Sequence, residues 1–260
     1  MLEDDFSDVL RKAMLGRAFK LAGVARCTGL EEAAILDFLN GGFSVEVARR
    51  LAGALGLKEE AFARHDRYQP RGLDLGGVER LDLAFEGDRV NAWLIREGDE
   101  LLLFDAGYDA EELMQVIDSL CNRLPSRVFL THGHRDHIGA LSVLLSAGVP
   151  VHAAQISGTI PMKADDIIKC GSILVCACDL SGHAMPSLGY QVSGLSQAVL
   201  VTGDALFAGS IGGCPTPQRY QLALERLGHV LGELPDKTVL LPGHGPASTL
   251  GEERYSNPFL

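Results

Sequence analysis

Histidine and aspartate residues are concentrated in one short stretch of the sequence, residues 131–137 (THGHRDH). The apolar run at 128–130 leads directly into it, which predicts a loop at the end of a strand, where a rigid scaffold can hold reactive groups. Imidazole and carboxylate groups are common ligands of zinc, iron and manganese. The stretch therefore predicts a metal site. Its candidate ligands are His132, His134, Asp136 and His137.

Three further residues repeat the pattern along the chain. His183, Asp204 and His244 each stand directly after a glycine, on a predicted loop that follows a predicted strand. Glycine permits the sharp backbone turn that directs the next side chain inward. With the first stretch, these residues make seven candidate metal ligands, and where two ions lie about 3.5–4 Å apart they can share a water molecule and lower its pKa to about 7. This chemistry predicts a metal-dependent hydrolase in which hydroxide attacks an acyl carbonyl.

The elements that position these residues belong to a predicted α/β domain, residues 71–260. Short runs rich in β-forming residues alternate with helical patterns, as expected when strands and helices share one domain. The predicted strands are 90–95, 100–105, 127–131, 173–177, 198–202 and 238–241. The predicted helices are 110–123, 137–147 and 217–231.

Residues 1–70 have a different pattern and predict a small, all-helical domain. Apolar residues recur there at helical spacing, and glycine-containing turns at 28–29, 40–42 and 56 separate short helices. Ser44 is a candidate N-cap. Residues 68–72 (YQPRG) predict a linker, and the strand-like pattern begins at Leu73.

The larger domain resembles the metallo-β-lactamase superfamily, and within it the glyoxalase II-like group (hydroxyacylglutathione hydrolase-like). The matching motifs are 90–95 (VNAWLI), 103–107 (LFDAG), 131–139 (THGHRDHIG), 182–187 (GHAMPS), 202–212 (TGDALFAGSIG), 242–246 (PGHGP), 253–254 (ER) and 257–258 (NP). The resemblance implies an αββα sandwich with two divalent metal ions at one edge of its sheets. It favours zinc, with iron or manganese as alternatives.

The resemblance also implies a role for each candidate ligand. One metal would be bound by His132, His134 and His183, and the other by Asp136, His137 and His244. Asp204 would bridge the two metals. Asp136 would also be catalytic, because it could orient the bridging hydroxide and take its proton. Asp105 is expected to contact a ligand histidine and not the metal itself.

Two departures from the related enzymes concern the substrate. After residues 209–212 (GSIG) those enzymes usually have an arginine, whereas Gly213 follows here. Glyoxalase II proper also binds glutathione with the help of a C-terminal helical domain, and this sequence runs only to Leu260. We therefore expect a thioester or another small acyl ester as the substrate, without specificity for glutathione.

The N-terminal helices resemble the Cro/repressor-type helix-turn-helix. In that fold the helix starting near Glu31 would place its first residues against DNA bases. Glu31 and Glu32 would repel phosphates, and residues 1–72 hold 11 basic and 11 acidic residues, so the segment has no net positive charge. The net charge of the whole chain is −11. These charges favour a helical docking module, or one that joins two copies of the chain as a homodimer, over a module that binds nucleic acid.

Two alternatives to the hydrolase remain open at this stage. A persulfide dioxygenase of the same superfamily would use one iron bound by a subset of the same positions. A DNA-binding regulator would use the metal domain to sense a ligand. No apolar run approaches the roughly 18 residues needed to cross a bilayer, and the acidic N-terminus lacks an apolar signal core. We therefore expect a cytoplasmic protein with no membrane partner.

Overall fold

Two six-stranded β-sheets form the centre of the computed structural model, which describes residues 1–72 and 75–260. The strand-like pattern expected from Leu73 therefore begins outside the described residues. The first sheet has the order β1 (Val78–Phe85), β2 (Asp88–Glu97), β3 (Glu100–Phe104), β4 (Arg127–Phe129), β5 (Val151–Ala153) and β6 (Ile160–Pro161). The second has the order β14 (Ser248–Thr249), β13 (Val239–Pro242), β10 (Val199–Gly203), β9 (Leu188–Ser193), β8 (Ile173–Asp179) and β7 (Ile167–Cys170).

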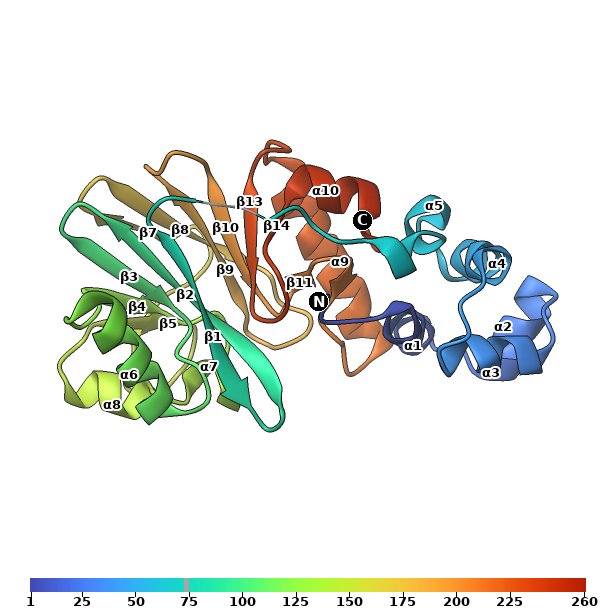
Figure 1. Cartoon of the computed structure of the whole chain (residues 1–260), viewed down its shortest axis with the longest axis horizontal. Helices are drawn as coiled ribbons and strands as arrows, with labels where there is room; N and C mark the ends of the chain where they lie inside the picture. The colour runs from blue at the N-terminus through green and yellow to red at the C-terminus, as the bar shows by residue number, and fades with distance from the viewer. Residues whose placement is uncertain (73–74) are drawn as a thin grey trace.

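Successive residues of β2 show why the sheets are buried on both faces. Trp93 and Ile95 point into the core between the two sheets, whereas Ala92 and Leu94 point into a second core under the helices. Side chains alternate across a strand, so a continuous apolar run suits a strand that is covered on both sides. The two sheets and their helical covers form an αββα sandwich (Figure 1), which confirms the predicted fold class.

Helices cover the outer face of each sheet. The first sheet carries α6 (Ala110–Cys121), α7 (Arg135–Ile138) and α8 (Leu141–Ser146), and the second carries α9 (Pro217–Gly232) and α10 (Leu250–Ser256). The predicted single helix at 137–147 is wrong. The amides of Gly139 and Ala140 donate to the carbonyls of Gly107 and Ala106, at 2.7 and 3.2 Å, and so leave the helical ladder between α7 and α8.

A short hairpin follows Asp204 and matters for the site. Its strands are β11 (Leu206–Phe207) and β12 (Ser210–Ile211), with Leu206 paired to Ile211. Gly209 turns the hairpin with φ +75°, a conformation that side-chain-bearing residues rarely adopt.

The N-terminal helices have a core of their own. They are α1 (Phe6–Gly16), α2 (Leu21–Thr28), α3 (Glu32–Leu39), α4 (Val45–Leu55), α5 (Glu59–Phe62) and the 3₁₀ helix η1 (His65–Arg67). Ser44 caps α4 as predicted, since its side chain accepts from the amide of Val47. Buried Ile35, Phe38 and Leu51 belong to this core. The helix-turn-helix resemblance and the boundary at residue 70 stay predictions.

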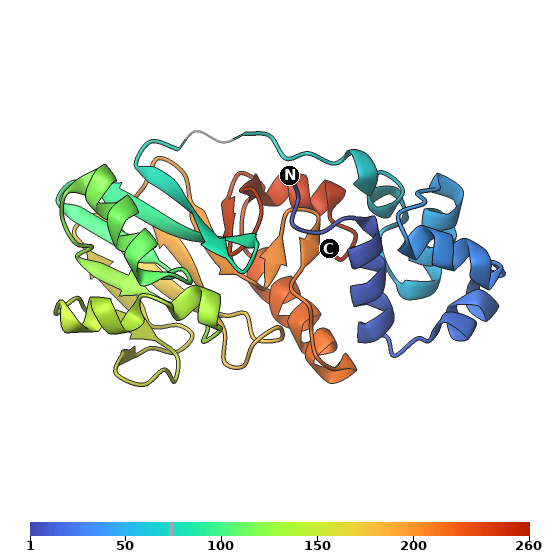
Figure 2. The ribbon, with the colours of Figure 1, turned by 60° about the horizontal axis from the view of Figure 1, so that its bottom comes forward.

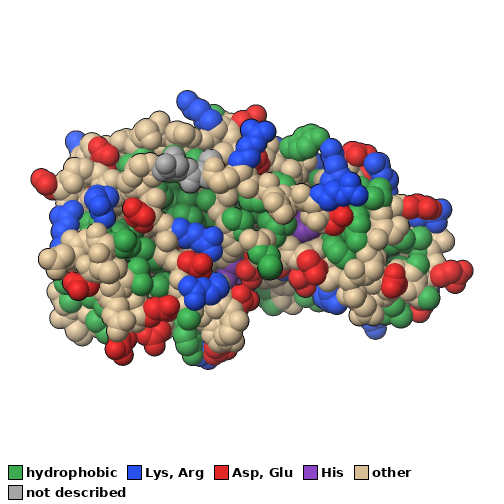
Figure 3. All heavy atoms as spheres, in the orientation of Figure 1, with side chains coloured by type: hydrophobic (Ala, Val, Ile, Leu, Met, Phe, Trp, Pro, Cys, Tyr) green, Lys and Arg blue, Asp and Glu red, His purple; other side chains and the backbone are tan. Residues whose placement is uncertain are grey.

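These helices lie against α9 and α10, at the end of the sandwich shown on the right in Figures 1 and 2. Phe259 packs against both the N-terminal core and the core under α9. Acidic and basic side chains are interspersed over the face seen in Figure 3, including its helical end. Among the described residues, no helix is long and apolar enough to span a bilayer.

Candidate metal centre

The fold brings all seven predicted ligands together from four separate stretches of the chain. They form two groups that share Asp204, and within each group the candidate ligand atoms lie within 4.8 Å of one another. The loops after β4, β8, β10 and β13 and the start of α7 carry them. The first group is His132, His134, His183 and Asp204, and the second is Asp136, His137, Asp204 and His244.

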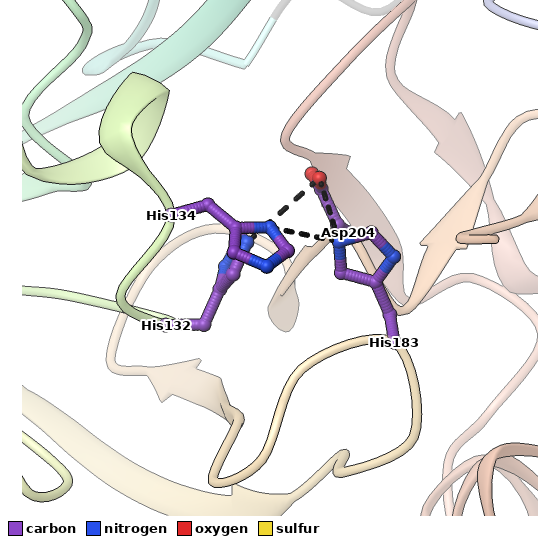
Figure 4. Close-up of side chains that lie close together, drawn as sticks. All are labelled: His132, His134, His183 and Asp204. Atoms are coloured by element: carbon purple, nitrogen blue, oxygen red, sulfur yellow. Dashed lines mark hydrogen bonds and ion pairs between the residues drawn. The ribbon is translucent and has the colours of Figure 1, made fainter. Parts of the chain in front are cut away.

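In the first group the side chains converge on one point (Figure 4). His183 Nε2 lies 3.0 Å from His134 Nδ1. The same His183 nitrogen lies 3.5 Å from Asp204 Oδ2, and His132 Nε2 lies 3.9 Å from that oxygen. Three imidazole nitrogens and one carboxylate thus surround a small volume.

The second group lies on the other side of Asp204. His137 Nε2 is 3.3 Å from Asp204 Oδ1, whereas Oδ2 of the same carboxylate lies near ligands of both groups. His244 Nε2 is 3.3 Å from Asp136 Oδ2 and 3.6 Å from Asp204 Oδ2. A carboxylate placed in this way can bridge two cations.

The second ring nitrogen of three histidines is held by the protein. The Nδ1 atoms of His183 and His244 donate to backbone carbonyls, those of Gly213 and Arg89, each at 2.7 Å. A carbonyl only accepts, so the Nδ1 atoms carry protons, and in the neutral rings both Nε2 atoms are free to bind a metal. Such outer contacts fix the tautomer and orientation of a ligand ring.

Asp105 holds the third of these rings, as predicted. Its Oδ2 accepts from Nδ1 of His137 at 2.8 Å. Its carboxylate also accepts from the amide and hydroxyl of Thr131, and that hydroxyl lies 3.0 Å from Nδ1 of His132. A single buried carboxylate thus supports ligands of both groups.

Unpaired polar atoms in the site provide a test of whether a metal fits. His132 Nε2, His137 Nε2 and Asp204 Oδ1 are buried and have no hydrogen-bond partner among the described residues. Leaving such atoms unpaired is unfavourable, by about 1–3 kcal/mol each, unless something binds them. All three face the two proposed metal positions. The donor set therefore fits divalent cations.

The electrostatics also favour bound positive charge. Burial opposes charge on His137, but the carboxylates of Asp204 and Asp105 outweigh it and raise the pKa of His137 to about 10. Burial likewise opposes charge on His244, but bonds to Asp136 and Asp204 raise its pKa to about 11. The carboxylate field that favours protons on these rings would equally favour a metal cation.

The remaining histidines lie outside both groups, as predicted. His65 is buried against Gly209, His152 stacks on Phe129, and His229 is on α9. Sequence reasoning missed Thr131 and the carbonyls of Arg89 and Gly213. Thr131 precedes the first ligand and could have been considered, but any residue supplies a carbonyl, so no side-chain pattern identifies one.

Comparison with known proteins agrees with this geometry. Residues 85–165 match the family described as "Metallo-beta-lactamase superfamily". Hydroxyacylglutathione hydrolase GloC of Haemophilus influenzae is 30% identical over 185 residues, which cover 61% of this chain and 86% of that protein.

Two solved structures share the fold and 26% sequence identity with this chain. BLEG-1, a B3 metallo-β-lactamase, aligns with a TM-score of 0.57 over 70% of this chain and 99% of its own. TTHA1623, solved in a di-iron-bound form, aligns with a TM-score of 0.57 over 69% of this chain and 100% of its own. With the two ligand groups and the αββα sandwich, these matches show that the chain belongs to the metallo-β-lactamase superfamily.

Proposed function

We propose that the protein is a dinuclear metal-dependent hydrolase of a thioester or another small acyl ester. The observation that carries the proposal is the pair of ligand groups that share Asp204. When bound, two divalent ions polarise a carbonyl and make water acidic enough to supply a nucleophile near neutral pH. Zinc is our first choice, and iron and manganese suit the same ligand types. His132, His134 and His183 would hold one ion, Asp136, His137 and His244 the other, and Asp204 both.

Asp136 is the residue to which we assign the proton transfer. Its side chain is 9% exposed, and its Oδ2 lies 3.3 Å from His244 Nε2. Burial acts to raise the pKa of Asp136, but the hydrogen bond from His244 and the charge of His137 outweigh burial and lower it. The carboxylate is therefore ionised at neutral pH, where it can orient an attacking water and accept its proton.

A cavity of about 650 Å³ beside the first ligand group suits the acyl part of a substrate. Ser181 and Pro186, on the loop that carries His183, line it. Ile156 also lines it, and its Cδ1 would lie 3.9 Å from a Cβ added at Gly133, between two ligand histidines. Other apolar lining residues include Met162 and Leu188. The size and lining support a small, partly apolar acyl group.

The identity to a hydroxyacylglutathione hydrolase supports a thioester as the bond that is cleaved. Specificity for the glutathione part is a separate matter. Gly213, which takes the place of the expected arginine, contributes a backbone carbonyl to His183 and carries no cationic side chain. We therefore propose that turnover depends on the acyl group and not on a glutathionyl moiety.

The first experiment is to measure metal identity and stoichiometry by elemental mass spectrometry, with His132→Ala as the control. We expect about two divalent ions per chain in the wild type and fewer in the variant, because His132 would ligate only one of them. A single iron per chain would contradict the dinuclear centre and favour sulfur oxidation.

The second experiment measures hydrolysis of thioesters and esters by the metal-loaded protein. Loss of a positioned general base typically lowers the rate by 10²–10⁴-fold, so we expect Asp136→Asn to reduce kcat by roughly that factor. Its metal content has to be measured in parallel, because the same carboxylate is a proposed ligand. Turnover that strictly required a glutathionyl group would contradict the proposed substrate class.

Ile156→Trp tests the acyl cavity. The larger side chain would fill space beside the first ligand group, so we expect KM to rise about tenfold for longer acyl chains, with acetyl substrates little affected. Val143→Trp is the matched control, because Val143 is 40% exposed on α8. Equal effects of Ile156→Trp on short and long substrates would place the acyl group elsewhere.

A further inference from the structure

We propose that Lys12, on α1 of the N-terminal helices, is a positioning residue for the metal centre. The inference rests on the proposed function, because it concerns how the chain holds those ligands. It gives the N-terminal helices a role in holding the metal ligands of their own chain, through the segment that begins at Asp204. We call this segment, residues 204–213, the Asp204 loop.

Lys12 contacts the Asp204 loop directly, although the two are far apart in sequence. Its Nζ donates to the carbonyl of Ile211 at 2.8 Å and lies 5.2 Å from the centre of the Phe207 ring. Lys12 also pairs with Asp4. The two charged side chains are 19% and 10% exposed, so water and salt screen this pair much less than a surface pair.

The loop contacts ligands of both groups. Two residues beyond Ile211, the Gly213 carbonyl accepts from Nδ1 of His183. Between them, a Cβ added at Gly212 would lie 3.0 Å from His183 Cγ, so the backbone packs tightly against that ring. The Phe207 ring stands perpendicular to the ring of His244 at 5.8 Å between centres.

Lys12 is therefore one contact away from a ligand of each group. Through Ile211 it fixes the backbone that orients His183, and through Phe207 it contacts the ring that packs on His244. The buried partner Asp4 keeps the ammonium in place, because removal of either charge would leave the other buried and unpaired. A shift of this backbone would misalign ligand nitrogens without removing any of them.

The turn of the same loop has a second, independent restraint. His65 donates to the carbonyl of Gly209 at 2.9 Å, and Glu253 accepts from the amide of Gly209 at 2.8 Å. Tyr68 in turn donates to Glu253 at 2.7 Å. The N-terminal segment thus holds the turn of the hairpin through His65 and the end nearest His183 through Lys12.

The experiment measures how fast the metal-loaded, full-length protein releases its metal to a chromogenic chelator. Lys12→Met removes the charge and the donors at similar length, and Lys12→Arg keeps both. The combined variant Asp4→Asn/Lys12→Met also removes the charge that would otherwise be left buried. Lys20→Met is the matched control, because Lys20 is an exposed lysine of the same helical segment and its side chain forms no cap bond.

We expect Lys12→Met to release metal about tenfold faster than the wild type, the lower end of the range for groups that support metal ligands. Lys12→Arg should release metal at close to the wild-type rate, and Lys20→Met should release it at the wild-type rate. The combined variant should regain thermal stability but still release metal quickly, because Ile211 still lacks its donor.

Three results would overturn the inference. These are wild-type release by Lys12→Met, equal acceleration by Lys20→Met, and wild-type release by the combined variant, which would mean that only the buried charge mattered. Release is measured without any substrate. An absence of hydrolase activity would therefore contradict the proposed function and leave this test valid, whereas wild-type release by Lys12→Met would contradict only the positioning role.

Discussion

At the residue scale, Asp105 shows how one side chain can serve two ligands from an uncommon backbone conformation. Its φ of +60° lies in the left-handed region, which few residues other than glycine, asparagine and aspartate adopt. Its hydrogen bonds to Thr131 and His137 hold the side chain in place. Asp105 is 2% exposed, so water has little access to compete for these hydrogen bonds.

Asp105→Asn is therefore expected to weaken metal binding more than it weakens the fold. Asparagine tolerates the left-handed conformation better than most residues and keeps the volume, but it removes the negative charge beside His137. Loss of such a partner typically costs 10–100-fold in metal affinity, and we expect a decrease of about that size. Competition with a chelator measures it. Asp99→Asn, at an exposed position, is the control, and equal affinities for the two variants would contradict the role of Asp105.

The side chains of the site could be predicted from sequence because their chemistry identifies them. Imidazole and carboxylate groups after glycine turns are rare enough in combination to point to one site, as at His183 and Asp204. The groups that orient them could not be predicted, because Gly213 and Arg89 act through backbone carbonyls. The contact from Lys12 is also absent from any local pattern, since it spans 199 positions.

At the element scale, the packing of α1 against α9 depends on Gly16. A Cβ added at this buried glycine would fall 2.3 Å from two atoms of the Tyr220 ring. Alanine favours helix by up to about 1 kcal/mol relative to glycine, but overpacking a tight contact costs about 1–3 kcal/mol. The steric term is therefore the larger of the two.

We expect Gly16→Ala to lower the free energy of unfolding by about 1–2 kcal/mol, measured by urea denaturation. Gly228→Ala on α9 is the matched control, because an added Cβ there meets nothing within 4 Å. That variant should be neutral or stabilised. Stabilisation by Gly16→Ala as well would mean that α1 and α9 do not pack as described.

The longer helices of the sandwich could be predicted from sequence, whereas the strands β1 and β9 and the two-residue strands were missed. α6 and α9 match the predicted helices to within two residues, because their apolar periodicity extends over several turns. β6, β11, β12 and β14 have only two residues each, so no alternation can be detected in them. The break between α7 and α8 comes from amides that bond to residues 106–107, a contact that depends on the tertiary fold.

At the scale of the whole molecule, His65 makes the contact of the N-terminal helices with the Asp204 loop sensitive to pH. Burial lowers the pKa of His65 below 6.5, although the Gly209 carbonyl and the carboxylates of Asp4, Asp5 and Asp66 partly oppose this. Below about pH 6.5 the unfolded chain takes up a proton that the folded chain resists. Stability contributed by this residue is therefore present above that pH and is lost as the pH falls.

His65→Gln tests this dependence, because glutamine offers an amide donor for Gly209 but does not titrate. One such group changes the free energy of unfolding by at most about 1.4 kcal/mol per pH unit. We expect the wild type to lose stability faster than the variant between about pH 6.5 and 5, in parallel denaturation curves. Identical pH profiles would show that His65 does not contribute.

The two hydrogen bonds of the Gly209 backbone offer a way to observe how the two ends of the chain pack on the Asp204 loop. The Gly209 amide is held by Glu253, near the end of the chain, and its carbonyl by His65, near the start. Amide protons in such contacts exchange with solvent only when the surrounding structure opens. The deuterium uptake of this one amide would therefore report whether the first helices and the last helix are packed on the loop together, with no attached probe or added ligand.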